Sequence, residues 1–182
     1  KNLLRPCNFP FGSPGFGYMT FMKNDQKYVV INVQLRIFMR ELLACPFKAV
    51  ESILAMYKDD SSTIIIIDVH GETTSEKLCF ANYFDGKAHI IFGTHTHVQT
   101  ADERIFPKGT GYITDVGMVG SYFSSIGKSF ASATNQFLTQ MPTKFEDETA
   151  DPFVFSAILA MVEENAQNMT TCIKIERIAY LS

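Results

Sequence analysis

Three of the four histidines in this sequence lie just after short apolar runs, where their imidazoles could act together. His70 comes after residues 64–69, and both His95 and His97 come after residues 88–92. Neutral imidazole is a good ligand for zinc, iron and manganese, and an ion with an open coordination position lowers the pKa of a bound water toward neutrality. These residue types therefore indicate a metal site capable of hydrolysis.

Two strands joined by a helix are expected to position these histidines. Residues 63–69 form a short β-branched run that is apolar on both faces, which predicts a buried strand. A hydroxyl residue and a glutamate within residues 73–76 predict a capping box, and residues 85–86, Asp-Gly, predict the end of the helix. Residues 87–92 then predict the second strand. Parallel strands joined by a right-handed crossover share one carboxyl edge, where ligands bind in such sheets.

All three histidines are expected to converge at that edge. His70 ends the first strand and His95 follows the second, and an extended backbone from His95 to His97 would place both rings on one side. A lone histidine at a strand end is more often a surface or hydrogen-bonded residue than a ligand. Three at one edge, with carboxylates nearby, favour a metal site. His89 lies within the second strand and is interpreted as a structural or surface residue.

The rest of the sequence predicts a single α/β domain over residues 1–182, with 46% hydrophobic residues to build its core. Ahead of the histidines we expect an irregular segment, a hairpin and a helix. Beyond them we expect a strand, a loop with a helix, and a closing hairpin around a polar turn. These elements are expected at residues 1–17, 18–33, 46–57, 111–115, 124–141 and 153–181, with the polar turn at 165–168.

The amino-acid composition argues against some classes of binding partner. The chain has 16 basic and 19 acidic residues and a net charge of −3, so it lacks the basic footprint of a duplex nucleic-acid-binding protein. Its apolar clusters fall far short of the roughly 20 residues that span a membrane, and no signal peptide is visible. The four cysteines are widely spaced, which favours free thiols. We therefore expect a cytoplasmic protein that binds neither duplex nucleic acid nor membrane.

Four segments of the chain also resemble a known family. They are residues 4–15, 67–77, 93–104 and 112–118, and the third begins with Gly-Thr-His-Thr-His. In these segments the sequence resembles the YmdB-like family of calcineurin-like dinuclear metallophosphoesterases. The resemblance covers nearly the whole chain in consistent order.

The resemblance implies a fold and an activity. The fold is a four-layer α/β/β/α metallophosphoesterase sandwich. The activity is that of a bacterial cytoplasmic hydrolase, a metal-dependent phosphodiesterase or phosphatase that acts on small phosphoesters such as 2′,3′-cyclic nucleotides through a metal-bound hydroxide. Two divalent or trivalent metal ions, iron or manganese, are the implied cofactors, because a pair of ions generates the nucleophile and stabilises phosphoryl charge. Association into a homo-oligomer is left open.

Site residues follow by motif position. His70 and His95 resemble ligands of one metal ion, and His97 resembles a ligand of the other. Arg36 and Ser124 lie in segments whose family counterparts are close to the active site, so they are candidates for substrate contact.

Carboxylates near the histidines are expected to support the ligands. Asp102 or Glu103 could accept the second N–H of a metal-bound imidazole, although an ion pair with Arg104 is the alternative. Asp115 is interpreted as a supporting residue. Asp68 and Glu72 are interpreted as caps or as partners of the ligands, since carboxylates beside strand ends commonly have those roles.

The sequence also departs from the family pattern. The family begins with a strand ending in aspartate, a glutamate-asparagine pair and a glycine-asparagine-histidine motif, which supplies a ligand and the general acid. None of these motifs occurs in this sequence. We therefore expect the chain to correspond to the carboxyl two-thirds of the family's domain, with the general acid upstream of Lys1. The alternative is a catalytically silent relative that acts as a binding or regulatory module.

Overall fold

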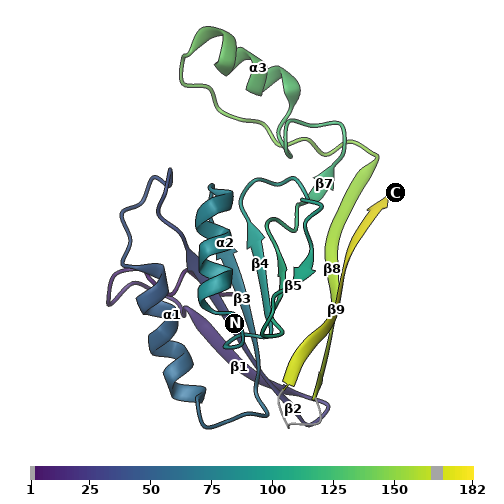
Figure 1. Cartoon of the computed structure of the whole chain (residues 1–182). Helices are drawn as coiled ribbons and strands as arrows, with labels where there is room; N and C mark the ends of the chain where they lie inside the picture. Colours follow the sequence, from purple (N-terminus) through teal and green to yellow (C-terminus); the bar gives the residue numbers. More distant parts are fainter. Residues whose placement is uncertain (1–2, 165–169) are drawn as a thin grey trace.

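The computed structural model describes residues 3–164 and 170–182, which form two β-sheets and three α-helices (Figure 1). The larger sheet has six strands in the order β1-β2-β3-β4-β6-β5. Strands β2, β3, β4 and β6 run parallel, and the edge strands β1 and β5 run antiparallel to their neighbours. Their bounds are β1 Tyr18–Lys23, β2 Gln26–Gln34, β3 Ile64–His70, β4 Ile90–Thr94, β5 Arg104–Ile105 and β6 Gly111–Ile113.

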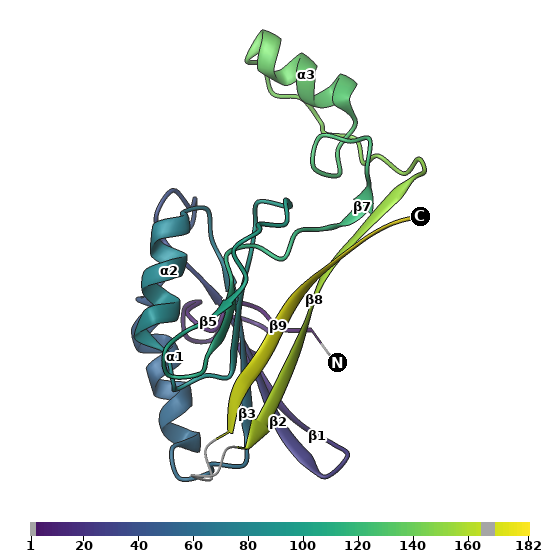
Figure 2. The same ribbon diagram turned by 45° about the vertical axis from the view of Figure 1, so that its right-hand side comes forward.

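Two of the three connections between parallel strands are helical. Helix α1, Pro46–Leu54, continues into a 3₁₀ turn, Ala55–Tyr57, and connects β2 to β3. Helix α2, Thr74–Tyr83, connects β3 to β4. Successive right-handed crossovers that advance in one direction place their helices on the same face of the sheet, and Figure 2 shows α1 and α2 on one side of the six strands.

The core lies between these helices and the sheet. Along Ile64–Ile67 of β3, Ile66 is half-buried and the other three residues are buried, so both faces are covered as the continuous β-branched sequence predicts. Phe80 from α2 and Phe84 at the C-cap of α2 are fully buried in the same core cluster as this strand. Burying one such side chain contributes about 1.5–3 kcal/mol relative to leaving it exposed, so this layer holds the strands in register.

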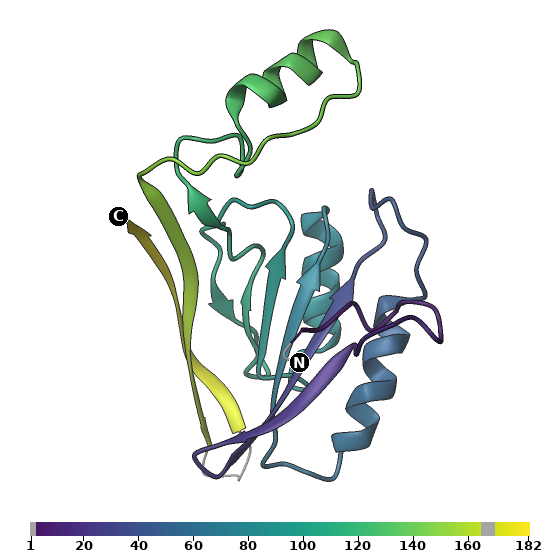
Figure 3. The ribbon, with the colours of Figure 1, turned by 180° about the vertical axis from the view of Figure 1, so that it is seen from behind.

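A smaller antiparallel sheet has the order β7-β8-β9, with β7 Val119–Ser121, β8 Phe153–Glu164 and β9 Thr170–Leu181. Strand β9 contacts β5 and β6, and the β8–β9 pair lies on the side of the large sheet away from α1 and α2 (Figure 2). Helix α3, Phe130–Thr139, projects beyond the end of the strands instead of covering the small sheet (Figure 3). The described residues thus form three layers, α/β/β, and the four-layer arrangement is not confirmed.

Most predicted elements are confirmed, within a few residues at their ends. The predicted strand and hairpin positions correspond to β1–β4, β6, β8 and β9, and the predicted helices to α1, α2 and α3. The polar turn predicted at 165–168 lies outside the described residues. In the part of the chain that the structure describes, no helix is both long and apolar enough to cross a membrane.

The predicted capping box of α2 is wrong. Thr73 is the N-cap residue, but its side chain makes no capping hydrogen bond, and its buried Oγ1 has no partner among the described atoms. The Glu76 carboxylate instead accepts hydrogen bonds from the backbone N–H groups of Arg36 (3.2 Å) and Ile37 (2.9 Å). Glu76 therefore ties α2 to the loop after β2 rather than closing its own helix.

Candidate functional site

Strands β3 and β4 bring His70 and His95 together. His70 pairs with Thr94 in the parallel register, so His95 is the first residue beyond the same edge. The two rings meet edge to face, with centroids 4.9 Å apart and an interplanar angle of 87°. Nε2 of His70 lies 3.1 Å from Nδ1 of His95. The predicted convergence of these two histidines is confirmed.

A hydrogen-bond relay behind His70 fixes its tautomer. Asn32 on β2 donates to one oxygen of Asp68 on β3 (2.7 Å), and the hydroxyl of Thr94 donates to the other (2.8 Å). Because that hydroxyl donates to the carboxylate, its oxygen accepts from Nδ1–H of His70 at 3.0 Å. The lone pair of His70 therefore lies on Nε2, the nitrogen that faces His95.

Burial shifts the pKa values of both titrating groups in this relay. It lowers the pKa of His70, and the nearby His95 ring acts in the same direction. Burial raises the pKa of Asp68, against the hydrogen bonds from Thr94 and Asn32. The lowered pKa of His70 favours its neutral imidazole, which is the form that binds metals.

His95 is held from its other side by Glu72. The Glu72 carboxylate lies 3.0 Å from Nε2 of His95, and its side chain is 50% exposed. With the lone pair of His70 on Nε2, the contact between the two rings needs an N–H on Nδ1 of His95. Both contacts of His95 are therefore satisfied together when the ring carries two protons, or when a cation takes the place of the proton between the rings.

The backbone after β4 is not extended, which corrects the expectation that all three rings converge. His95 and His97 have φ values of 117° and 65°, in the region that side-chain-bearing residues rarely adopt. His97 consequently turns away from the other two rings, and its Nδ1 lies 2.9 Å from the carbonyl oxygen of Ile126. It lines a cavity of about 240 Å³ beside α3, together with residues such as Phe137.

A buried ion pair holds this unusual loop. Lys77 on α2 is 1% exposed and Asp115 is 0% exposed, and their side chains lie 3.1 Å apart. Lys77 Nζ also donates to the carbonyl oxygen of Thr94 (2.9 Å). Asp115 accepts from the backbone N–H groups of Thr96 and Gly117, each at 2.9 Å. The pair therefore fixes the backbone on both sides of His95.

Lys77 was missed by reasoning from the sequence, although a signal existed. It shares the inward face of α2 with Phe80, Ala81 and Phe84, at spacings of three, four and seven residues. A lysine on such a face is seldom buried without a partner. Asp115, which was predicted as a supporting residue, is that partner.

Gly93 allows the close approach on which this arrangement depends. A Cβ at this position would overlap the backbone carbonyl of Thr114, and it would also press on the side chain of Lys77. The chain after β6 thus passes directly against β4. A glycine is required because two backbones meet here.

The contacts of Arg36 and Ser124 are with residues other than the imidazole pair. Arg36 is exposed in the loop after β2, at the carboxyl edge of the sheet. The hydroxyl of Ser124 donates to the carbonyl of Ser121 (2.6 Å) and accepts from the N–H of Gly127 (2.8 Å), so it stabilises a turn.

Asp102 and Glu103 contact neither histidine of the pair. Asp102 forms an ion pair with Arg104 at 3.1 Å, the alternative weighed from the sequence, and accepts from the hydroxyl of Thr100. Glu103 forms an ion pair with Arg177 on β9 at 2.8 Å. Nδ1–H of His70 instead donates to the hydroxyl of Thr94, which in turn donates to Asp68.

The His70–His95 pair fits two ligands of one metal ion. Nitrogens bound side by side to an ion at about 2.0–2.1 Å would lie roughly 3.0–3.4 Å apart, and the observed separation is 3.1 Å. Within residues 3–164 and 170–182, no three His, Cys, Asp or Glu side chains are grouped closely enough to hold an ion. His97 is separated from the pair, as a ligand of a different ion would be.

Comparisons of this chain with a family model and with curated proteins agree with each other. Residues 1–178 match the family described as YmdB-like protein. The chain is 42% identical over 180 residues to the 2′,3′-cyclic-nucleotide 2′-phosphodiesterase of Bacillus subtilis (strain 168). The aligned region covers 97% of this chain and 65% of that protein.

Two crystal structures have the same fold. One is of a hypothetical protein from Thermus thermophilus, with a TM-score of 0.87 at 34% identity, covering 98% of this chain and 67% of that one. The other is of a novel phosphatase from Mycoplasma pneumoniae, with a TM-score of 0.86 at 34% identity, covering 100% of this chain and 64% of that one.

These matches define how the chain relates to its relatives. Because the family match runs over nearly the whole chain, it does not bear out the expectation that the chain is the carboxyl two-thirds of the family's domain. The chain spans 65% of the length of the Bacillus subtilis protein. Its mixed α/β fold is that of the solved phosphatase from Mycoplasma pneumoniae.

Proposed function

The chain belongs to the YmdB-like protein family, and from this premise we propose that it acts as a metal-dependent phosphodiesterase, which hydrolyses small phosphoesters such as 2′,3′-cyclic nucleotides. The observation that carries the proposal is the 3.1 Å approach of His70 and His95 at the carboxyl edge of the sheet, with the lone pair of His70 directed at His95. The named activity of the Bacillus subtilis relative supports the choice of substrate.

His70 and His95 would hold one ion, and His97 would contribute to a second. Iron or manganese would supply activation of water and neutralisation of charge on the phosphoryl oxygens. Thr94 and Asp68 keep Nε2 of His70 free of a proton, so the ligand nitrogen is prepared before any ion arrives.

The remaining residues position this pair. Glu72 restrains the ring of His95 through its Nε2. Lys77 and Asp115 restrain the backbone that carries it, and they are too deeply buried to contact substrate. Arg36, exposed at the same edge, is the proposed contact for a phosphate oxygen, because a guanidinium matches phosphate geometry.

Hydrolysis of 2′,3′-cyclic AMP by the purified chain, after metal removal and after addition of Mn²⁺ or Fe²⁺, tests the proposal. We expect turnover that depends on the added metal and is lost in His95→Ala. His89→Ala is the matched control, because it removes a histidine at the opposite end of the same sheet. Metal-independent turnover, or full turnover in His95→Ala, would contradict the proposal. Absence of both turnover and metal binding would favour the binding module.

A further inference from the structure

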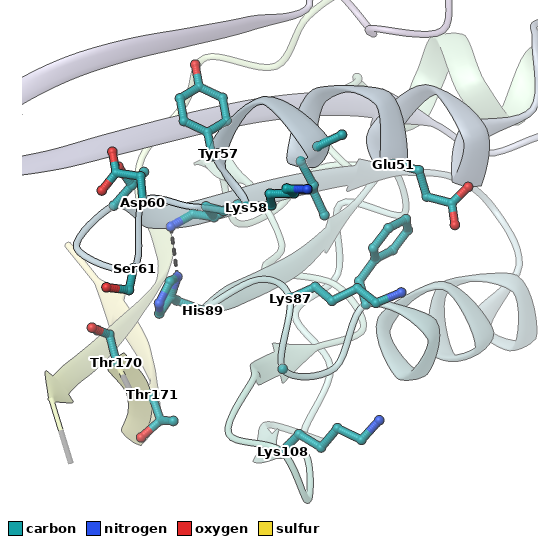
Figure 4. A pocket seen from close by; sticks show the side chains of 16 residues that line it. Glu51, Tyr57, Lys58, Asp60, Ser61, Lys87, His89, Lys108, Thr170 and Thr171 are labelled. Carbon is teal, nitrogen blue, oxygen red and sulfur yellow. Dashed lines mark hydrogen bonds between the residues drawn. The ribbon is translucent and has the colours of Figure 1, made fainter. Parts of the chain in front are cut away.

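A second concave site lies at the opposite, amino-terminal end of the parallel strands (Figure 4). Its volume is about 610 Å³, within the range of roughly 300–1,000 Å³ that holds small organic ligands in proteins. Five segments enclose it: the end of α1 with its 3₁₀ turn, the loop before β3, the loop between α2 and β4, the turn between β5 and β6, and the start of β9 at Thr170 and Thr171. It is separated from the His70–His95 pair by the length of the strands.

The floor of this cavity is apolar. Ala55, which is exposed, and Leu54 and Tyr57, which are partly buried, offer apolar surface to it, and the buried Ile65 and Phe84 lie beneath them. Ser61 adds an exposed hydroxyl at the margin. Such a floor suits a flat or aliphatic body, since burial of apolar surface provides most of the binding free energy of small ligands.

Three lysines give the rim a positive charge. Lys58, Lys87 and Lys108 come from three different segments and line the cavity (Figure 4). No carboxylate of the described residues forms an ion pair with any of them. Lys87 lies over the rings of Tyr83 and Phe84, with Nζ 4.6 and 5.7 Å from the ring centroids, so its ammonium is held close to the apolar floor.

The acidic residues of the lining do not cancel this charge. Glu51 is paired with Lys48 and Asp60 with Lys27, each at 2.9 Å, and neither of these lysines lines the cavity. His89 is uncharged, because its Nδ1 accepts the N–H of Ile65 at 2.9 Å. The three rim lysines therefore remain as the net charge that a ligand would meet.

We propose that this cavity binds an organic phosphate with an apolar ring, of which a nucleoside 5′-monophosphate is the representative class. The phosphate would accept from the ammonium groups at the rim, and the base would lie on the apolar floor. A lysine contributes to phosphate binding as a point charge with three rotatable donors on a flexible stem, so the rim lysines nearest the phosphate can turn toward it and donate to it. The inference is independent of the proposed phosphodiesterase function, because it uses no residue of the histidine edge.

Calorimetric titration of the metal-free chain with AMP tests the proposal, with adenosine and inorganic phosphate as separate ligands. We expect AMP to bind at least tenfold more tightly than either fragment, because both halves of the cavity contribute. Equal affinity for AMP and inorganic phosphate would show a simple anion site and overturn the proposal.

Variants locate the binding. Lys87→Gln combined with Lys108→Gln is expected to weaken AMP binding by about tenfold or more, since each removes a charge-assisted contact. Lys144→Gln, an exposed lysine in the loop after α3, is the matched control and is expected to leave the affinity unchanged. Ala55→Trp, at an exposed position of the lining, should fill the cavity and abolish binding without disturbing the core.

His95→Ala distinguishes the two ends of the sheet. AMP affinity is expected to be the same in this variant as in the unchanged chain. Loss of AMP binding in His95→Ala, or unaltered binding in Ala55→Trp or in the double lysine variant, would place the ligand elsewhere and overturn the proposal.

Discussion

The two ends of the six-stranded sheet use histidine in opposite ways. At the carboxyl end, His70 and His95 direct ring nitrogens at each other, and a relay through Thr94 keeps one of those nitrogens unprotonated. At the amino end, the unprotonated nitrogen of His89, Nδ1, accepts the backbone N–H of Ile65 and is unavailable to a ligand. The comparison teaches that the neighbours of the ring nitrogens, not the position of a histidine along a strand, decide whether it can bind a metal.

Lysine residues also have different roles at the two ends of the sheet. Lys77 is buried at the carboxyl end, where it holds the loop of His95 through Asp115 and Thr94. Lys87 and Lys108 are exposed at the amino end, on the rim of a cavity. The first lysine is part of the scaffold, and the other two are available to a ligand.

Removing the buried lysine should produce the largest effect. Lys77→Met leaves the Asp115 carboxylate buried without its partner, so we expect a loss of about 3–5 kcal/mol in the free energy of unfolding, measured by urea denaturation. Lys48→Met, which removes an exposed ion pair with Glu51, is the control and should change stability little. If the two variants were equally stable, the ion pair would not be what holds the loop.

Breaking the relay behind His70 should affect metal binding more than folding. Thr94→Val keeps the shape of the side chain but removes the hydroxyl that joins Asp68 to His70. We expect roughly a 10- to 100-fold loss of Mn²⁺ affinity, measured by competition with a chelating dye. Thr74→Val, which changes an exposed threonine at the start of α2, is the control. An unaltered Mn²⁺ affinity in Thr94→Val would show that the relay does not contribute to metal binding by His70.

The smallest predicted effect concerns pH at the amino end. Burial lowers the pKa of His89 in the folded chain below its ordinary value near 6.5. The unfolded chain therefore takes up the proton first as pH falls, and the stability that the neutral ring contributes is present above pH 6.5 and is lost progressively below it. His89→Asn retains an acceptor for the Ile65 N–H but does not titrate.

We expect the loss of unfolding free energy between pH 7.5 and 5.5 to be smaller in His89→Asn than in the unchanged chain, by chemical denaturation at both pH values. Other groups titrate equally in both proteins, so the difference between them isolates His89. Identical pH dependence in the two proteins would show that His89 does not change its charge in this range.

Much of the fold could be predicted because its signals are local. The buried strand around Ile64–Ile67 and the glycine at position 86, with φ of 78°, follow from short stretches of sequence. The parallel pairing of β3 and β4 follows from the helix between them. These features depend on neighbours along the chain, which the sequence displays directly.

The errors concern contacts between distant segments. Glu76 binds backbone groups 39 and 40 residues away, so its capping role could not be assessed locally. Lys77 is buried because Asp115 lies opposite, 38 residues later in the chain. The same pair contacts the backbone on both sides of His95, and the positive φ values of His95 and His97 separate two rings that an extended strand would have kept together.

The amount of metal bound by the chain tests the central claim most directly. After saturation with Mn²⁺ and removal of free ions, elemental analysis should find the metal in the unchanged chain and in His89→Asn, and little in His70→Ala or His95→Ala. Equal metal content in all four proteins would contradict this claim, because His70 and His95 would then contribute no more to metal binding than His89 does.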